Sequence, residues 1–191
     1  MMVTRLPRNS WPWLAMALMI VAASAGLLVQ GRLWWCAYGD SNLWSGKVLS
    51  EHNSQHLFDP YSFTHVLHGV LWCWVLVWVW PRLAVAWQLA LAVGTSALWE
   101  VIENTDFVIR RFREATISLD YYGDTVANSV GDTLCCAAGF GLARWLGFRW
   151  SLAVFVTTEM ILLFWIRDNL TLNVLMLLYP LEAVKTWQLG Q

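Results

Sequence analysis

Apolar stretches long enough to cross a bilayer follow one another along most of this chain. Of its 191 residues, 58% are hydrophobic and only 13% are charged, whereas about 25% of the residues of a soluble domain are charged. The sequence therefore predicts an all-α fold, a polytopic membrane helix bundle of five to six transmembrane helices that forms a single domain over residues 1–191. We expect spans at about 11–35, 62–80, 83–103, 124–145 and 151–166.

The first and the last apolar segments can each be interpreted in two ways. The tripeptide Ala-Ser-Ala at 23–25 resembles a signal-peptidase site, but the apolar run continues through residues 27–29, so we expect a retained first helix. Residues 170–187 form either a sixth, kinked span or a segment that lies at the membrane interface, because Pro180 and Glu182 interrupt the apolar pattern. Of these two alternatives we favour the sixth span.

Carboxylates lie within the apolar third and fourth spans. Glu100 and Glu103 are three residues apart, so they share one face of a helix. Asp124, Asn128 and Asp132 recur every four residues and form a polar stripe along the next helix. An ionisable residue inside a span costs roughly 3 kcal/mol on insertion scales, so this clustering indicates a site.

A second stripe on the fourth span consists of small residues. Ala127, Gly131, Cys135 and Gly139 recur every four residues, and small residues at this spacing let a neighbouring helix approach closely. Because the polar stripe lies beside the small-residue stripe, we expect its carboxylates to point into protein rather than into lipid.

The order of the spans brings the polar residues to one membrane face. Successive spans cross in opposite directions, so the start of the second, the end of the third, the start of the fourth and the end of the fifth share a side. We therefore expect a cavity that opens to that side. The residues placed there are His65, His68, Glu100, Glu103, Asp124, Asn128, Asp132 and Arg167.

These residue types suggest three roles. Paired carboxylates can share a proton and act as general acid and base, so the candidate catalytic residues are Glu100, Glu103, Asp124 and Asp132. Histidine and carboxylate side chains also suit a divalent metal as cofactor, with His65, His68, Glu103 and Asp132 as candidate ligands. Arginine suits a phosphate headgroup. The candidate substrate-binding residues are Arg110, Arg111, Arg113, Asn128, Tyr121 and Arg167.

Several motifs together resemble a known family. They are His65-x-x-His68-Gly69, Trp99-Glu100-x-x-Glu103-Asn104, Thr116-Ile-Ser-Leu-Asp120-Tyr-Tyr-Gly-Asp124, Asn128-Ser-x-Gly-Asp132 and Ile166-Arg-Asp-Asn-Leu-Thr-Leu-Asn173. Over about residues 56–188 the chain resembles uncharacterised protein family 0314, or domain of unknown function 2585, small multi-pass membrane proteins of alphaproteobacteria. The resemblance implies an inner-membrane location and no known activity. More loosely, the order of His, Trp-Glu-x-x-Glu, Asp and Asn-x-x-Gly is similar to the teicoplanin-resistance protein VanZ.

Three kinds of function fit this pattern. The first is a membrane-embedded enzyme that acts on a lipid or lipid-linked substrate by hydrolysis or proton-assisted transfer. The second is a binding or transport protein for a small polar solute or lipid headgroup, although no inverted repeat is apparent in the sequence. The third is an accessory protein in which these groups only hold the bundle together. A net charge of −1 and the lack of a basic tract argue against nucleic acid and leave the lipid bilayer as the expected partner.

The basic residues do not decide the orientation, because the 12 lysines and arginines divide equally between the two sides. Since arginines that belong to a site and long connectors count less, we expect a cytoplasmic N-terminus and a periplasmic polar face in the bacterial inner membrane.

The cysteines and the remaining histidines form no recognised metal-binding motif. None of the four cysteines belongs to a C-x-x-C pair, so we expect them to be small buried residues. His52 and His56 lie in the polar connector before the second span and can share a helical face. An exposed histidine pair in a loop usually has no further role, so we assign it none.

The order of the spans places Arg82 and Arg113 on opposite sides of the membrane. In a cysteine-free background, we expect a membrane-impermeant maleimide to label Arg82→Cys and Arg113→Cys from different sides. Labelling of both positions from the same side would contradict this topology.

Overall fold

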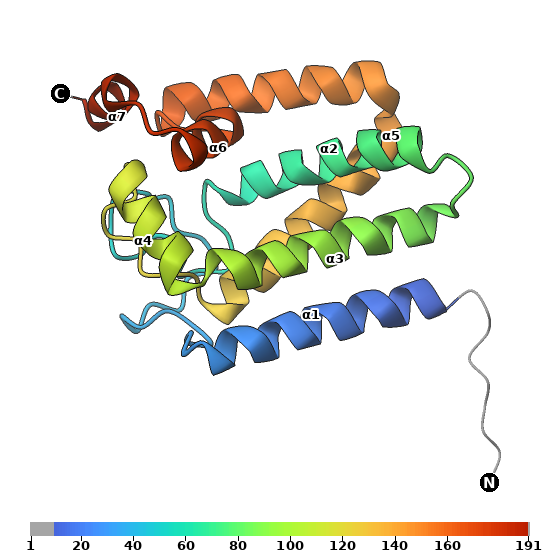
Figure 1. Ribbon diagram of the computed structural model, residues 1–191, viewed down its shortest axis with the longest axis horizontal. Helices are drawn as coiled ribbons and strands as arrows, with labels where there is room; N and C mark the ends of the chain where they lie inside the picture. Colours follow the sequence, from blue (N-terminus) through green and yellow to red (C-terminus); the bar gives the residue numbers. More distant parts are fainter. Residues whose placement is uncertain (1–9, 191) are drawn as a thin grey trace, which may run out of the picture.

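The structure, a computed structural model, describes residues 10–190, and the regular elements in this range are helices, apart from an isolated bridge between Trp44 and Phe58. Four of the helices are long and apolar enough to cross a membrane: α1 (Trp11–Val29), α2 (Ser62–Val79), α3 (Val85–Glu103) and α5 (Val126–Trp165). They form the bundle in Figure 1. The predicted all-α membrane fold is confirmed, while Arg5 and Arg8, counted in the orientation argument, lie outside the described residues.

Helix α5 contains both the predicted fourth and fifth spans. Its 40 residues change direction at Gly147, which has φ 73° and ψ 172°, a conformation that glycine adopts without steric cost. Figure 1 shows the two arms meeting at this bend. Each arm has about 20 residues, which is the length that crosses the hydrocarbon core.

Helix α1 ends at Val29, earlier than the predicted residue 35. The chain turns at Gly31, where φ is 82°, and the next residues serve another helix. The carbonyls of Leu33 and Trp34 accept hydrogen bonds from the backbone N–H groups of Val126 and Ala127, at 2.9 and 3.2 Å. These donors begin α5 and have no partner inside that helix, so the extended segment after α1 stabilises the start of α5.

The expected sixth span is two short helices. Helix α6 (Leu170–Leu178) has 9 residues and α7 (Glu182–Leu189) has 8, so neither approaches the roughly 20 residues that a span needs. Both lie at the end of the bundle that carries the long connectors (Figure 1). The prediction of a sixth span is therefore replaced by a pair of helices that cover this end.

The polar connector between α3 and α5 also contains a helix that the sequence pattern did not predict, α4 (Asp106–Ala115). The Thr105 hydroxyl accepts a hydrogen bond from the backbone of Val108 at its N-terminus, as an N-cap does. Ile109 and Phe112 are buried, whereas the arginines occupy the other face. Helix α4 thus packs one apolar face on the end of the bundle.

Glycines allow α2 and α5 to approach each other closely. A Cβ atom at Gly69 would overlap the carbonyl oxygen of Cys136, and one at Gly139 would overlap the carbonyl oxygen of Val66. A Cβ atom at Gly131 would overlap the carbonyl oxygen of Leu57, which precedes α2. The predicted close packing of the small-residue stripe is confirmed, although Gly131 meets the connector rather than a helix.

Replacing Gly139 by alanine tests this contact against a matched position. We expect Gly139→Ala to lower the free energy of unfolding by about 1–3 kcal/mol, because the new methyl group overpacks the interface. Gly141, on the same helix, has open space around its Cα, so Gly141→Ala should instead raise it by about 0.5–1 kcal/mol through helix propensity. Denaturant titration in detergent measures both, and equal effects of the two changes would contradict the packing.

Candidate functional site

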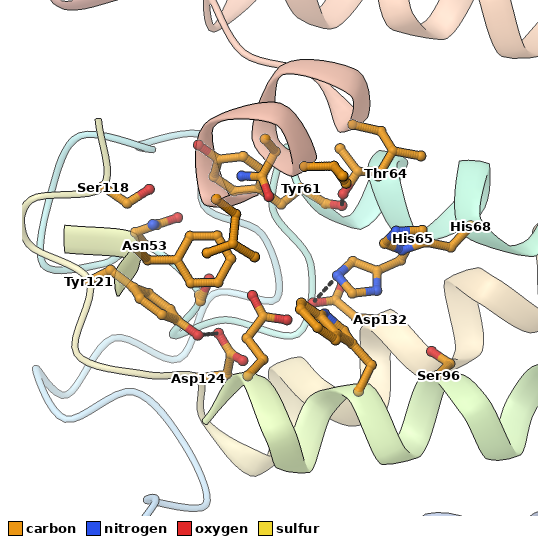
Figure 2. Close-up of a pocket in the computed structure, with 18 of the residues that line it drawn as sticks. Asn53, Tyr61, Thr64, His65, His68, Ser96, Ser118, Tyr121, Asp124 and Asp132 are labelled. Carbon is orange, nitrogen blue, oxygen red and sulfur yellow. Dashed lines mark hydrogen bonds and ion pairs between the residues drawn. The ribbon is translucent and has the colours of Figure 1, made fainter. Parts of the chain in front are cut away.

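A cavity of about 450 Å³ lies between α2, α3, α6 and the first arm of α5. Figure 2 shows its polar side chains converging from helices and connectors that are far apart in sequence. Most of the residues that the span order places on one side contribute to its lining. The polar lining includes Asn53, Tyr61, His65, His68, Glu103, Tyr121, Asp124 and Asp132, and the apolar lining includes Trp72, Trp99, Phe112, Leu170, Val174 and Leu177.

His65 lies between two carboxylates. Its Nδ1 is 3.5 Å from Oε1 of Glu100, and its Nε2 is 3.7 Å from Oδ2 of Asp132. The ring of His68 stands edge-on to His65, with the ring centroids 5.3 Å apart. Glu103 offers an oxygen within 4.8 Å of ligand atoms of His65 and Glu100. The predicted cluster of carboxylates and histidines is therefore present.

The most deeply buried member of this cluster accepts no hydrogen bond of normal geometry in the described residues. Glu100 is 1% exposed, and neither of its carboxylate oxygens has a hydrogen-bond partner, nor does Nδ1 of His65. A buried carboxylate that accepts no hydrogen bond is costly, so it requires a proton or a cation. Imidazole nitrogens and carboxylate oxygens also suit a divalent cation. His65, Glu100 and Glu103 each offer one such atom, and the three atoms lie within 4.8 Å of one another. His68 and Asp132, which are also predicted ligands, lie beside His65 but outside this group of three.

Asp124 is held by a network at the edge of the cavity. Its carboxylate accepts hydrogen bonds from Nδ2 of Asn104 at 2.6 Å and from the hydroxyl of Tyr121 at 3.0 Å. The backbone N–H of Asp124 donates to Oδ1 of Asn104 at 2.7 Å. Burial raises the pKa of Asp124 to about 6, although these two side chains favour the charged form. A carboxyl group with such a pKa exchanges its proton near neutral pH, as acid–base chemistry requires.

Asp132 is positioned by the start of α2. The hydroxyl of Ser62 donates to Oδ1 of Asp132 at 2.8 Å and accepts from the backbone N–H of Asp59 at 3.1 Å. Asp59 itself accepts backbone hydrogen bonds from Ser54, Tyr61 and Ser62. Burial raises the pKa of Asp59 to about 6. None of the sequence motifs includes Asp59, and Asn104 appears there only as the residue after Glu103.

Asn128 supports the site without lining the cavity. It is fully buried, and its Nδ2 donates to the backbone carbonyl of His56 at 2.8 Å. This contact joins α5 to the connector that follows α1, so Asn128 holds two walls of the cavity together instead of facing it.

The arginines predicted to bind a phosphate group do not line the cavity. Arg110 is exposed and bonds to the carbonyl of Asp106, while Arg111 donates to the carbonyl of Leu177 at 2.8 Å. These contacts fix α4 and its junction with α6. The cavity is therefore not lined by these arginines, and their binding of a phosphate group stays a prediction.

The other two arginines, Arg113 and Arg167, also make contacts within the protein. Arg113 stacks on the ring of Tyr122, with its guanidinium carbon 4.6 Å from the centroid, and Arg167 donates to the carbonyl of Trp187 at 3.3 Å. Arg167 has a positive φ of 55° and is exposed. It lies at the predicted end of the bundle but does not line the cavity.

A comparison of two buried glutamates tests whether the lack of hydrogen bonds to Glu100 lowers the stability of the protein. Glu159, in the second arm of α5, accepts hydrogen bonds from the backbone of Leu170 and Thr171 and from the Thr171 hydroxyl. We expect Glu159→Gln to lower the free energy of unfolding by about 1–3 kcal/mol. Glu100→Gln should raise it by roughly 1 kcal/mol at pH 8 in EDTA, because without a cation the buried carboxyl group must take up a proton on folding, and the amide need not. Thermal unfolding in detergent distinguishes these signs, and destabilisation by both changes would contradict the assignment.

Comparison with known proteins gives relatives along nearly the whole chain. A UPF0314 protein of Paracoccus denitrificans is 47% identical over 181 residues, which are 95% of this chain and 94% of the relative. A UPF0314 protein of Sphingopyxis alaskensis is 45% identical over 93% of this chain and 95% of the relative. One of Brucella anthropi is 43% identical over 93% and 89%.

No solved structure matches the chain, and the looser similarity to VanZ stays a prediction. A family model described as "Protein of unknown function (DUF2585)" matches residues 27–190. With the identities above, this match shows that the chain belongs to the UPF0314 (DUF2585) family, as its motifs predict.

Proposed function

We propose that this protein is an inner-membrane enzyme that admits the polar end of a lipid or lipid-linked substrate and acts on it by acid–base chemistry. The observation that carries the proposal is the composition of the cavity, where a buried carboxylate–histidine cluster faces an apolar wall. A site that combines an apolar surface with a few convergent polar groups is the usual form of a small-molecule pocket.

The apolar wall suits a hydrocarbon chain. Leu170, Val174 and Leu177 of α6 line one part of the cavity, and Trp72 and Trp99 line another. A lipid lying along these side chains would bring its headgroup to His65, Glu103 and Asp132. A soluble polar solute would leave this wall unused, which favours the lipid substrate over the solute.

The cluster supplies the groups that proton transfer needs. Glu103, Asp124 and Asp132 line the cavity and are the candidate acid and base, while His65 bridges Glu100 and Asp132. In the part of the chain that the structure describes, no lysine or arginine lines the cavity. An anionic headgroup therefore needs another positive partner. A divalent cation held by His65, Glu100 and Glu103 would supply that charge and would polarise a phosphoryl or carbonyl oxygen.

The orientation is part of the proposal. A cytoplasmic N-terminus would place the connectors and the cavity on the periplasmic side, because α1 ends beside them (Figure 1). The substrate would then be a lipid exposed at the outer face of the inner membrane.

The test compares strains that lack the gene and are complemented with variants of the full chain. We expect deletion to accumulate one lipid species, and wild-type protein to restore the profile in whole-lipid mass spectrometry. Glu103→Gln and Asp132→Asn should fail to restore it while keeping the wild-type melting temperature. Asp120 is an exposed carboxylate in the connector between α3 and α5. Asp120→Asn is therefore the matched control and should complement fully.

Two outcomes overturn the proposal. Complementation by Glu103→Gln and Asp132→Asn would show that the carboxylates do no chemistry. A lipid that co-purifies in native mass spectrometry, with an unchanged lipid profile on deletion, would make the protein a binding or transport protein instead.

A further inference from the structure

A second group of metal-binding side chains lies outside the cavity, in the connector between α1 and α2. Cys36, His52 and His56 each offer a ligand atom, and these atoms all lie within 4.8 Å of one another. Sγ of Cys36 is 3.8 Å from Nδ1 of His52, and the same Nδ1 is 3.3 Å from Nε2 of His56. The carboxylate of Asp40 lies 3.8 Å from Nε2 of His56.

These separations are close to those that a bound zinc ion imposes. Zinc–nitrogen bonds of about 2.0–2.1 Å and zinc–sulfur bonds of about 2.3 Å in a tetrahedral site place two nitrogens roughly 3.3 Å apart and a nitrogen and a sulfur roughly 3.6 Å apart. The corresponding distances here are 3.3 and 3.8 Å. Two of the three pairs of ligand atoms therefore already lie near the separations that one shared ion needs.

His56 is held in the orientation of a metal ligand. It is fully buried, and Cys36 is only 8% exposed. Nδ1 of His56 donates to the backbone carbonyl of Asn42 at 2.7 Å, so in the neutral ring the lone pair is on Nε2, which faces the other ligands. A backbone carbonyl on the second ring nitrogen is the usual partner of a metal-bound histidine.

We propose that Cys36, His52 and His56 bind Zn²⁺, with the carboxylate of Asp40 as the fourth ligand. A thiolate and two imidazoles are ligands that zinc prefers, whereas Ca²⁺ and Mg²⁺ prefer oxygen alone. With all four positions filled by protein, the site is of the structural kind.

The proposed ion would fix the connector against α5. The carbonyl of His56 accepts from Nδ2 of Asn128, and the carbonyl of Ser54 accepts from the backbone N–H of Thr125 at 3.1 Å. Asn53 and Ser54, between two of the proposed ligands, line the cavity. Zinc at this place would therefore hold one wall of the cavity, without touching the carboxylate cluster.

Cobalt substitution tests the site, because a Co²⁺–thiolate bond gives a near-ultraviolet charge-transfer band that carboxylate and imidazole ligands do not give. We expect the EDTA-treated full chain in detergent to develop this band with one equivalent of Co²⁺ and to lose it when Zn²⁺ is added. Cys36→Ser should abolish the band, and Asp40→Asn should weaken Zn²⁺ binding by about tenfold or more.

Two controls keep this result separate from the cavity. Cys73→Ser, which changes a buried cysteine of α2, and Glu103→Gln, which changes the carboxylate cluster, should both leave the band intact. If Cys36→Ser does not fold, two other measurements test the site. His52→Gln should abolish the band, and Zn²⁺ should protect Cys36 from maleimide in a Cys73→Ser, Cys135→Ser, Cys136→Ser background. Absence of the band in folded wild-type protein, or its persistence in Cys36→Ser, would overturn the proposal and leave a hydrogen-bonded histidine pair.

Discussion

The close contact between the backbones of α2 and α5 is the constraint on which the site depends. Gly69 of α2 and Gly139 of α5 each lie against a carbonyl of the other helix, and small residues at such crossings permit this approach in membranes. The same approach puts His65 of α2 within 3.7 Å of Asp132 of α5. Wider helix spacing would separate the imidazole from the carboxylate and divide the cluster.

The bundle and the location of the cluster were predictable, because both follow from spacing and from the order of the spans. Glu100, Glu103 and Asp132 meet as their positions near the ends of two successive spans require. The arginines were not predictable. Their direction is set by the buried face of α4 and by the carbonyls at the end of α6, as in the bond from Arg111 to Leu177. The sequence pattern did not predict α4, and it placed α6 within a longer apolar segment.

The two buried glutamates show why an acidic residue in an apolar helix does not by itself mark a site. Glu159 receives two backbone N–H groups and a hydroxyl, so it acts as a cap for α6. Glu100 receives no hydrogen bond among the described residues. Sequence cannot distinguish them, because the donors to Glu159 come from 11 and 12 residues further along the chain. For the same reason Cys36, spatially beside His52 across 16 positions, was assigned only to packing.

The dependence of α6 on Glu159 has a consequence for biogenesis. Both short helices leave the ribosome after α5, and neither is long enough for the translocon to insert as a span. Because Glu159 accepts the first N–H groups of α6, we expect α6 to dock after the second arm of α5 has formed, so that the apolar wall of the cavity is assembled late. Until α6 docks, the cavity lacks the wall that Leu170, Val174 and Leu177 form.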